Sequence, residues 1–96
     1  MNDLIRAEEF CRGHQLEVAY LYSLQEFGLI EVVSTDSQVF IRRDELPRLE
    51  KIVVFHRELQ VNLEGIDVIM NLLERVTRMQ DEVTQLRNRL KRYEEQ

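Results

Sequence analysis

Hydrophobic residues in the last third of the chain, from Asn62 to Gln96, recur at intervals of three and four, and this spacing predicts one long helix. Asn62 is a favourable N-cap, Glu64 places a carboxylate near the helix N-terminus, and no proline follows. The recurring apolar positions are Ile66, Ile69, Leu73, Val76, Met79, Val83, Leu86, Leu90 and Tyr93. This is a heptad-like pattern with one irregularity, between Val76 and Met79.

The irregularity predicts a change of partner along the helix, near Thr77. Before it, additional apolar residues widen the apolar face, as expected for a helix that lies on a globular core. These additional residues are Val68, Met70 and Leu72. Beyond it the apolar positions narrow to a coiled-coil seam made of Met79, Val83, Leu86, Leu90 and Tyr93. We therefore expect the first half of 63–96 to pack on the preceding domain and the second half, about 77–96, to form a coiled coil.

Charged residues beside this seam favour pairing with a second copy of the chain. With Met79 at a d position, Glu82 and Arg89 fall at g, and Arg87 and Glu94 fall at e. In a parallel pair these g and e positions meet with opposite charges. An antiparallel pair, or a helix folded back on its own domain, would satisfy the same apolar pattern. The sequence therefore predicts a homodimer without fixing the direction of pairing.

The N-terminal part begins with an extended segment at 4–5 and a short helix at about 7–12. Gly13 is expected to end this helix, since glycine is favoured near helix C-termini. Phe10 and Cys11 are its expected inward residues.

A second helix is predicted over 17–27, with Gly28 at the C′ position. Leu21 and Leu24 lie on one face of it and are expected to face the core. The residues of another face are Val18, Tyr22, Gln25 and Glu26.

A β-hairpin and a third helix follow. The β-branched and aromatic runs 30–33 and 38–41 flank a polar turn at 34–37. Asp44 is expected to cap the third helix, with Pro47 in its first turn. Its expected inward residues are Leu49, Ile52, Val53 and His56. The order of elements predicts a mainly α chain with a small β hairpin: a winged helix-turn-helix domain over 1–62, followed by the long C-terminal helix 63–96.

Net charge is distributed unevenly between these two parts. The 96-residue chain carries a net charge of −5, and the segment through Gly65 holds twelve acidic and seven basic residues, while Ile66 to Gln96 holds six of each. An acidic domain repels nucleic acid and attracts basic protein surfaces. A domain of this size also buries only a small core, which argues against a deep substrate pocket.

No catalytic or metal-binding pattern emerges. Cys11 and His14 have metal-ligand spacing, but zinc needs more ligands and the only other histidine is His56. We expect a buried thiol and two structural or surface histidines. The chain has neither a phosphate-binding glycine-rich loop nor a nucleophile motif, so we expect no enzyme and no cofactor.

The chain also shows no sign of membrane insertion or secretion. No apolar run reaches transmembrane length, and the first ten residues lack the basic and apolar regions of a signal peptide. The single cysteine cannot form an internal disulfide bond. We expect a cytoplasmic protein with no membrane partner.

DNA binding is expected from a winged helix-turn-helix but is opposed by the residues present. Gly13 to Ile41, which covers the second helix and most of the wing, contains no lysine or arginine. Phosphate and base contacts depend on such residues. Direct binding to nucleic acid is therefore not expected.

Two runs resemble the MerR family. The first half of a MerR-type winged helix resembles the run Glu9, Phe10, Cys11, Leu16, Leu21, Leu24, Phe27, Gly28, Leu29 and Ile30. The opening of that family's next helix resembles Leu63, Glu64, Gly65 and Ile66. The MerR pattern has an Arg-Tyr pair ahead of its Gly-Leu step, where this chain has Tyr22 to Gln25.

A more specific resemblance is to the chaperone modulator CbpM family, which is MerR-like. It is carried by Gly65, Ile66, Leu72, Leu73, Val76, Leu86, Arg87, Arg89 and Leu90. The resemblance implies a non-enzymatic modulator that binds the J-domain of a DnaJ/CbpA-type co-chaperone and inhibits it. The alternatives are a MerR-like DNA-binding transcriptional regulator and a coiled-coil adaptor.

The partner surface is expected on the second helix. A J-domain presents a basic helix to its Hsp70, so a competitor should offer carboxylates beside an apolar or aromatic anchor. Glu17, Val18, Tyr22 and Glu26 lie close together on the outward side of that helix and meet this requirement. The alternative is that Tyr20 and Tyr22 pack against the wing or the long helix.

Overall fold

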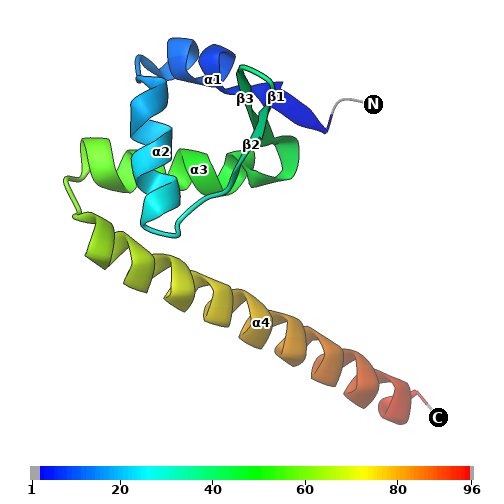
Figure 1. Cartoon of the computed structure of the whole chain (residues 1–96). Helices are drawn as coiled ribbons and strands as arrows, with labels where there is room; N and C mark the ends of the chain where they lie inside the picture. The colour runs from blue at the N-terminus through cyan, green and yellow to red at the C-terminus, as the bar shows by residue number, and fades with distance from the viewer. Residues whose placement is uncertain (1–2, 96) are drawn as a thin grey trace. The chain divides into compact units, whose positions relative to one another are not determined.

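The computed structural model describes residues 3–95 and contains four α-helices and three short strands (Figure 1). In chain order these are β1 (Leu4–Arg6), α1 (Ala7–His14), α2 (Val18–Glu26), β2 (Val32–Thr35), β3 (Gln38–Arg42), α3 (Leu46–Val53) and α4 (Leu63–Glu94). A 3₁₀ turn, η1 (Arg43–Glu45), precedes α3, and a π-helical turn, η2 (Val54–Glu58), follows it. The predicted mainly helical architecture with a long C-terminal helix is confirmed, although Gln96 lies outside the described residues.

The chain divides into two compact units, Met1–Leu63 and Glu64–Gln96. In the first unit the helices α1, α2 and α3 gather around a small sheet (Figure 1). The second unit is a single helix, α4.

The sheet of the first unit has three antiparallel strands in the order β1-β3-β2. β2 and β3 form the predicted hairpin, in which Val33 faces Phe40. The extended segment predicted at 4–5 is strand β1, which adds a third strand to the sheet because Ile5 pairs with Ile41 on the other side of β3. A strand of three residues is too short to show a recognisable alternation in the sequence.

The core of the first unit is formed by the helices α1, α2 and α3, by β3 and by the loop after α2. Its buried residues are Ala7, Phe10, Cys11, Leu21, Leu24, Leu29, Ile30, Ile41, Leu49, Ile52 and Val53. The inward faces predicted for the three helices are therefore confirmed, except that His56 is only half-buried and lies in η2.

One of the two predicted helix-ending glycines is placed correctly. Gly28 follows α2 with a φ of +86°, and the amides of Gly28 and Leu29 bond to the carbonyls of Gln25 and Leu24 at 2.9 and 3.0 Å. This is a Schellman arrangement, which needs a left-handed residue at C′. The prediction for Gly13 is wrong, because α1 continues to His14.

The residue that ends α1 is Gln15, which adopts a left-handed φ of 57°. The amides of Gln15 and Leu16 then bond to the carbonyls of Arg12 and Cys11. The helix thus closes with a non-glycine residue in a conformation that glycine adopts more readily.

The predicted N-cap of the third helix is also wrong. Asp44 lies inside η1, and the residue before α3 is Glu45, which makes no side-chain cap bond. The 3₁₀ turn begins the helical backbone early, since the amide of Leu46 bonds to the carbonyl of Arg43. The Glu45 carboxylate instead accepts a bond from the Glu31 amide at 3.3 Å.

The long helix α4 starts directly after Asn62, as predicted. Its buried residues are Ile66 and Met70, and every described residue from Asn71 onward is exposed. Nine large apolar side chains of α4 are exposed: Val68, Leu72, Leu73, Val76, Met79, Val83, Leu86, Leu90 and Tyr93.

Candidate protein-interaction surfaces

Helix α2 buries one side and leaves the other open. Leu21 and Leu24 are fully buried and hold the helix on the core of the first unit. At 3.6 residues per turn, the opposite side is formed by residues that are exposed or, at the first turn, half-buried. We call the four exposed residues Ala19, Tyr22, Ser23 and Glu26 the outward face of α2.

The four residues predicted to bind a partner lie on or beside this face. Tyr22 and Glu26 are one turn apart on it, and both are exposed. Val18 lies one turn before Tyr22 and is half-buried, while the exposed Glu17 occupies the N-cap position without a side-chain cap bond. Tyr22 and Glu26 therefore share the exposed side of α2 with the half-buried Val18 beside them, whereas Glu17 precedes the helix one turn before the buried Leu21.

Two residues of the outward face were missed in the sequence analysis. These are Ala19 and Ser23, and the Ser23 hydroxyl donates a hydrogen bond to the Ala19 carbonyl at 3.2 Å. A helical projection of 17–27 would have found both residues, but their small side chains carry no chemical signal.

Gln25 was predicted to share a face of the helix with Tyr22, and in the structure its side chain has a structural role. Its Oε1 accepts a hydrogen bond from the Val32 amide at 2.7 Å and so links the end of α2 to β2. The intervening loop is held again by Arg48, whose Nε donates to the Leu29 carbonyl at 2.9 Å. The C-terminal end of α2 is therefore fixed on the first unit.

The two tyrosines of α2 differ in their surroundings. The Tyr20 hydroxyl and His56 Nδ1 are 2.7 Å apart, and the two rings stack with centroids 5.5 Å apart. The Arg57 guanidinium lies 5.6 Å from the centre of the Tyr20 ring. Burial raises the pKa of Tyr20, and the positive charge of Arg57 partly offsets this. Tyr20 therefore joins α2 to η2, whereas Tyr22 is 40% exposed.

The cysteine and the histidines lie in separate environments. Cys11 is buried, and this burial raises the pKa of its thiol. His14 Nδ1 bonds to the Phe10 carbonyl at 3.1 Å, and its ring stacks on Phe10. Within residues 3–95 no group of three or more His, Cys, Asp or Glu side chains is arranged to hold a metal ion.

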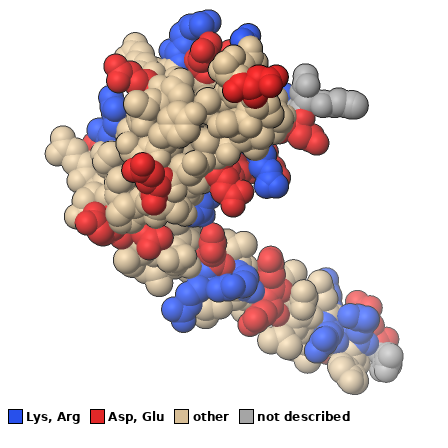
Figure 2. Space-filling model, viewed as in Figure 1, with Lys and Arg blue, Asp and Glu red and all other residues tan. Residues whose placement is uncertain are grey.

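Several arginines of the first unit make contacts within that unit. Arg48 and Arg57 contact the Leu29 carbonyl and the Tyr20 ring, as described above. Arg42 lies 4.0 Å from the Glu31 carboxylate at the wing. In the view of Figure 2, Asp and Glu side chains lie among uncharged ones on the visible side of the first unit around α2. The helix α2 itself contributes no lysine or arginine that could contact phosphate groups.

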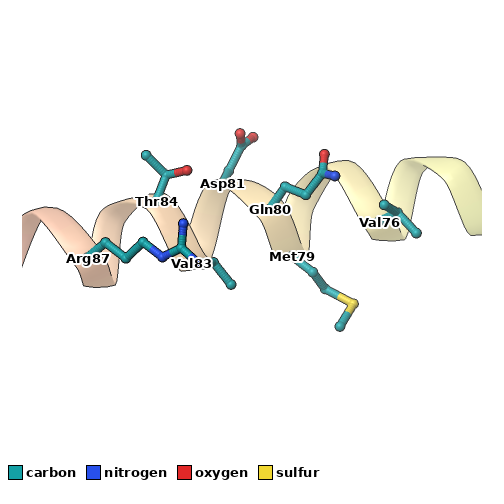
Figure 3. A pocket seen from close by; sticks show the side chains of 7 residues that line it. All are labelled: Val76, Met79, Gln80, Asp81, Val83, Thr84 and Arg87. Atoms are coloured by element: carbon teal, nitrogen blue, oxygen red, sulfur yellow. The ribbon is translucent and has the colours of Figure 1, made fainter.

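The predicted seam of α4 is exposed along its whole length. Met79, Leu86 and Tyr93 are 60%, 61% and 76% exposed. Figure 3 shows Met79 and Val83 projecting from one side of the helix, and Gln80, Asp81 and Thr84 from the other. Positive and negative side chains alternate along the same helix (Figure 2). None of the helices within residues 3–95 has the length and apolar character needed to cross a membrane.

Comparison with known proteins agrees with this fold. A family model described as MerR HTH family regulatory protein matches residues 5–88. The chain is also 26% identical over 84 residues to the chaperone modulatory protein CbpM of Pseudomonas entomophila (strain L48), covering 86% of this chain and 83% of that protein. It is 25% identical to the protein of the same name from Pseudomonas putida (strain W619), with the same coverage.

No solved structure matches the chain at a comparable level of significance. The family resemblance predicted from the sequence is confirmed by the family model and by these relatives. None of the three descriptions denotes an enzyme.

Proposed function

The chain belongs to the MerR HTH family, and from this we propose that it uses the family's fold to bind a protein, as a non-enzymatic chaperone modulator. The observation that carries this proposal is the absence of lysine and arginine from Gly13 to Ile41, across α2 and most of the wing. These are the elements with which a winged helix-turn-helix contacts DNA. An acidic surface at this place favours a basic protein over a nucleic acid.

The proposed partner is the J-domain of a DnaJ/CbpA-type co-chaperone. The similarity to proteins named chaperone modulatory protein supports a partner within the chaperone system. A J-domain uses a basic helix to contact its Hsp70, and an acidic protein that covers this helix would prevent that contact. The expected effect is therefore inhibition of the co-chaperone.

The second half of α4 is proposed to pair with a second copy of the chain. Its seam leaves Met79, Val83, Leu86, Leu90 and Tyr93 exposed in a single chain. The Glu and Arg residues beside the seam have complementary charges. Burying such a seam against its own copy removes apolar surface from water at no electrostatic cost.

Stimulation of an Hsp70 ATPase by a J-domain co-chaperone is the direct test of the function. Adding the full chain in increasing amounts should lower the stimulated rate toward the basal rate of Hsp70 alone. The basal rate itself should not change, because the proposed target is the J-domain. An unchanged stimulated rate, together with no heat of binding to the isolated J-domain, would show that the proposal is wrong.

The family description favours a second candidate, a DNA-binding regulator. This candidate predicts tight binding to duplex DNA from the upstream region of its own gene, with affinity that falls steeply as salt increases. We expect no binding above the level seen with an unrelated duplex of the same length.

A further inference from the structure

We propose that the outward face of α2, together with Glu17 at its N-terminal end, is the surface on which a basic amphipathic helix of the partner protein docks. The proposal rests on the proposed function, in which this partner is a J-domain. It assigns the contact to one side of one helix of the first unit and excludes α4 as the docking site.

The surface shape of the outward face of α2 is suited to contact with a helix of the partner. Ala19 and Ser23 have short side chains and lie one turn apart, beside Tyr22 and Glu26 on the exposed side. The Ser23 hydroxyl already bonds to the Ala19 carbonyl, so covering it leaves no unsatisfied donor. A partner helix can therefore approach the α2 backbone closely beside the protruding Tyr22 ring.

Tyr22 is suited to be the anchor of this contact. It is 40% exposed, whereas Tyr20 on the same helix is held by His56 and Arg57. A tyrosine combines a large apolar ring with a hydroxyl and loses little conformational entropy on binding, and it is enriched among residues that dominate binding energy. The ring of Tyr22 is thus available to cover apolar side chains of the partner.

Charge selects the kind of helix that fits. Glu17 precedes α2 at the N-cap position and Glu26 lies in its last turn, and neither is in an ion pair that the structure records. Arg42, at the end of β3, lies beside Glu31 and so has part of its charge compensated. A helix bearing lysine or arginine on both sides of an apolar residue would complement this arrangement.

The face is also held rigidly in place. The buried side chains of Leu21 and Leu24 hold α2 on the core, and the Schellman arrangement at Gly28 closes its C-terminal end. The bond from the Val32 amide to Gln25 links this end to the sheet. A surface that is ordered before binding avoids the entropic cost of ordering it on contact.

Calorimetric titration of an isolated J-domain against the full chain tests the surface. Tyr22→Ala should weaken binding by about tenfold. Ala19→Arg should weaken it more, because it adds both bulk and the wrong charge on the outward face, while arginine retains good helix propensity. Glu26→Lys should weaken binding about fivefold at low salt and less at high salt.

Matched controls are available elsewhere in the first unit. Glu50→Lys makes the same charge change at an exposed position of α3, and Leu59→Ala removes an apolar side chain that is 62% exposed. Both should bind the J-domain like the parent chain. Circular dichroism should show the parent helix content in every variant, since none of the substituted side chains is buried.

The outcomes separate this inference from the function on which it rests. A parent chain that does not bind the J-domain overturns both. If the parent chain binds but Tyr22→Ala, Ala19→Arg and Glu26→Lys bind equally well, the docking surface is wrong and the proposed function stands. Equal losses in the variants and in Glu50→Lys would also overturn the assignment to α2.

Discussion

The first unit and the helix α4 contain the same kinds of apolar residues and use them in opposite ways. Leu21 and Leu24 of α2 are fully buried within their own unit. Leu86 and Leu90 of α4 are 61% and 58% exposed. The first unit therefore gains its stability from contacts within one chain, whereas the second half of α4 leaves apolar surface exposed to solvent, which the proposed pairing would bury.

The two regions also differ in net charge. The segment through Gly65 carries the whole net charge of −5, and the rest of the chain is neutral overall. Two copies of an acidic surface repel each other, so the first unit favours a basic partner of a different kind. A neutral helix with alternating signs is compatible with its own copy.

Truncation of one leucine in each region is expected to give the largest contrast. Leu24→Ala leaves a cavity in a small core and should lower the free energy of unfolding by about 3 kcal/mol. Leu86→Ala removes the same atoms from an exposed position and should lower the unfolding free energy of the monomer by less than about 0.5 kcal/mol. Urea denaturation at low protein concentration measures both values.

This pair of variants provides its own control, because the chemical change is identical. Equal losses of stability in the monomer would contradict the difference in burial between the two sites. A loss for Leu86→Ala that appears only at high protein concentration would instead support pairing through the seam.

A charge in the seam should abolish the pairing of α4. Leu86→Arg places a guanidinium between apolar side chains, where no acid is available to pair with it, and should weaken association by about 2 kcal/mol or more. Light scattering should show half the mass of the parent chain. Asn88→Arg is the matched control, because this position lies on the opposite side of the helix from the seam. A parent chain and a Leu86→Arg variant of equal mass would show that the seam does not hold a dimer.

Much of the fold was predictable because periodicity and glycine placement are local signals. The apolar repeat from Ile66 to Tyr93 predicted the extent of α4 almost to its last residue, and Gly28 predicted where α2 ends. The end of α1 was not predictable in this way, since Gln15 takes a left-handed conformation that favours glycine. β1 was recognised only as an extended segment, because its pairing with β3 is not local.

The candidate site was predictable only in its conspicuous residues. Tyr22 and Glu26 could be selected because they are aromatic and charged, while Ala19 and Ser23 carry no such signal although they lie on the same face. The different roles of Tyr20 and Tyr22 depend on His56, which lies 36 positions away from Tyr20 in the chain. No pattern within α2 contains that information.

The contact between Tyr20 and His56 should contribute moderately to the stability of the first unit. Tyr20→Phe keeps the ring but removes the hydroxyl, leaving the half-buried His56 Nδ1 without this partner, and should cost about 1 kcal/mol. Urea denaturation at pH 7 measures the loss. Tyr22→Phe is the control and should change stability little, since Tyr22 is more exposed. Equal effects of the two substitutions would contradict the structural role of Tyr20.

The Tyr20→Phe variant also tests how the stability of the first unit changes at alkaline pH. Because the pKa of Tyr20 is raised in the folded state, its neutral form contributes stability below the usual pKa of about 10. That contribution is lost as the pH rises through the raised value. Tyr20→Phe should therefore lose less stability than the parent chain over this alkaline range.

The smallest expected effect concerns the direction in which two α4 helices pair. In a parallel pair, Glu82 lies opposite Arg87 of the second copy. In an antiparallel pair whose register places Met79 opposite Leu90, Glu82 instead lies opposite Arg89 of the second copy. Glu82→Lys should therefore weaken association by about 0.5 kcal/mol in either arrangement, measured by sedimentation equilibrium at low salt. A second substitution then distinguishes the two. Arg87→Glu should restore association only in the parallel pair, and Arg89→Glu only in the antiparallel pair. Restoration by neither substitution would show that these charges do not meet across the seam, since exposed ion pairs lose their effect unless the geometry brings the groups together.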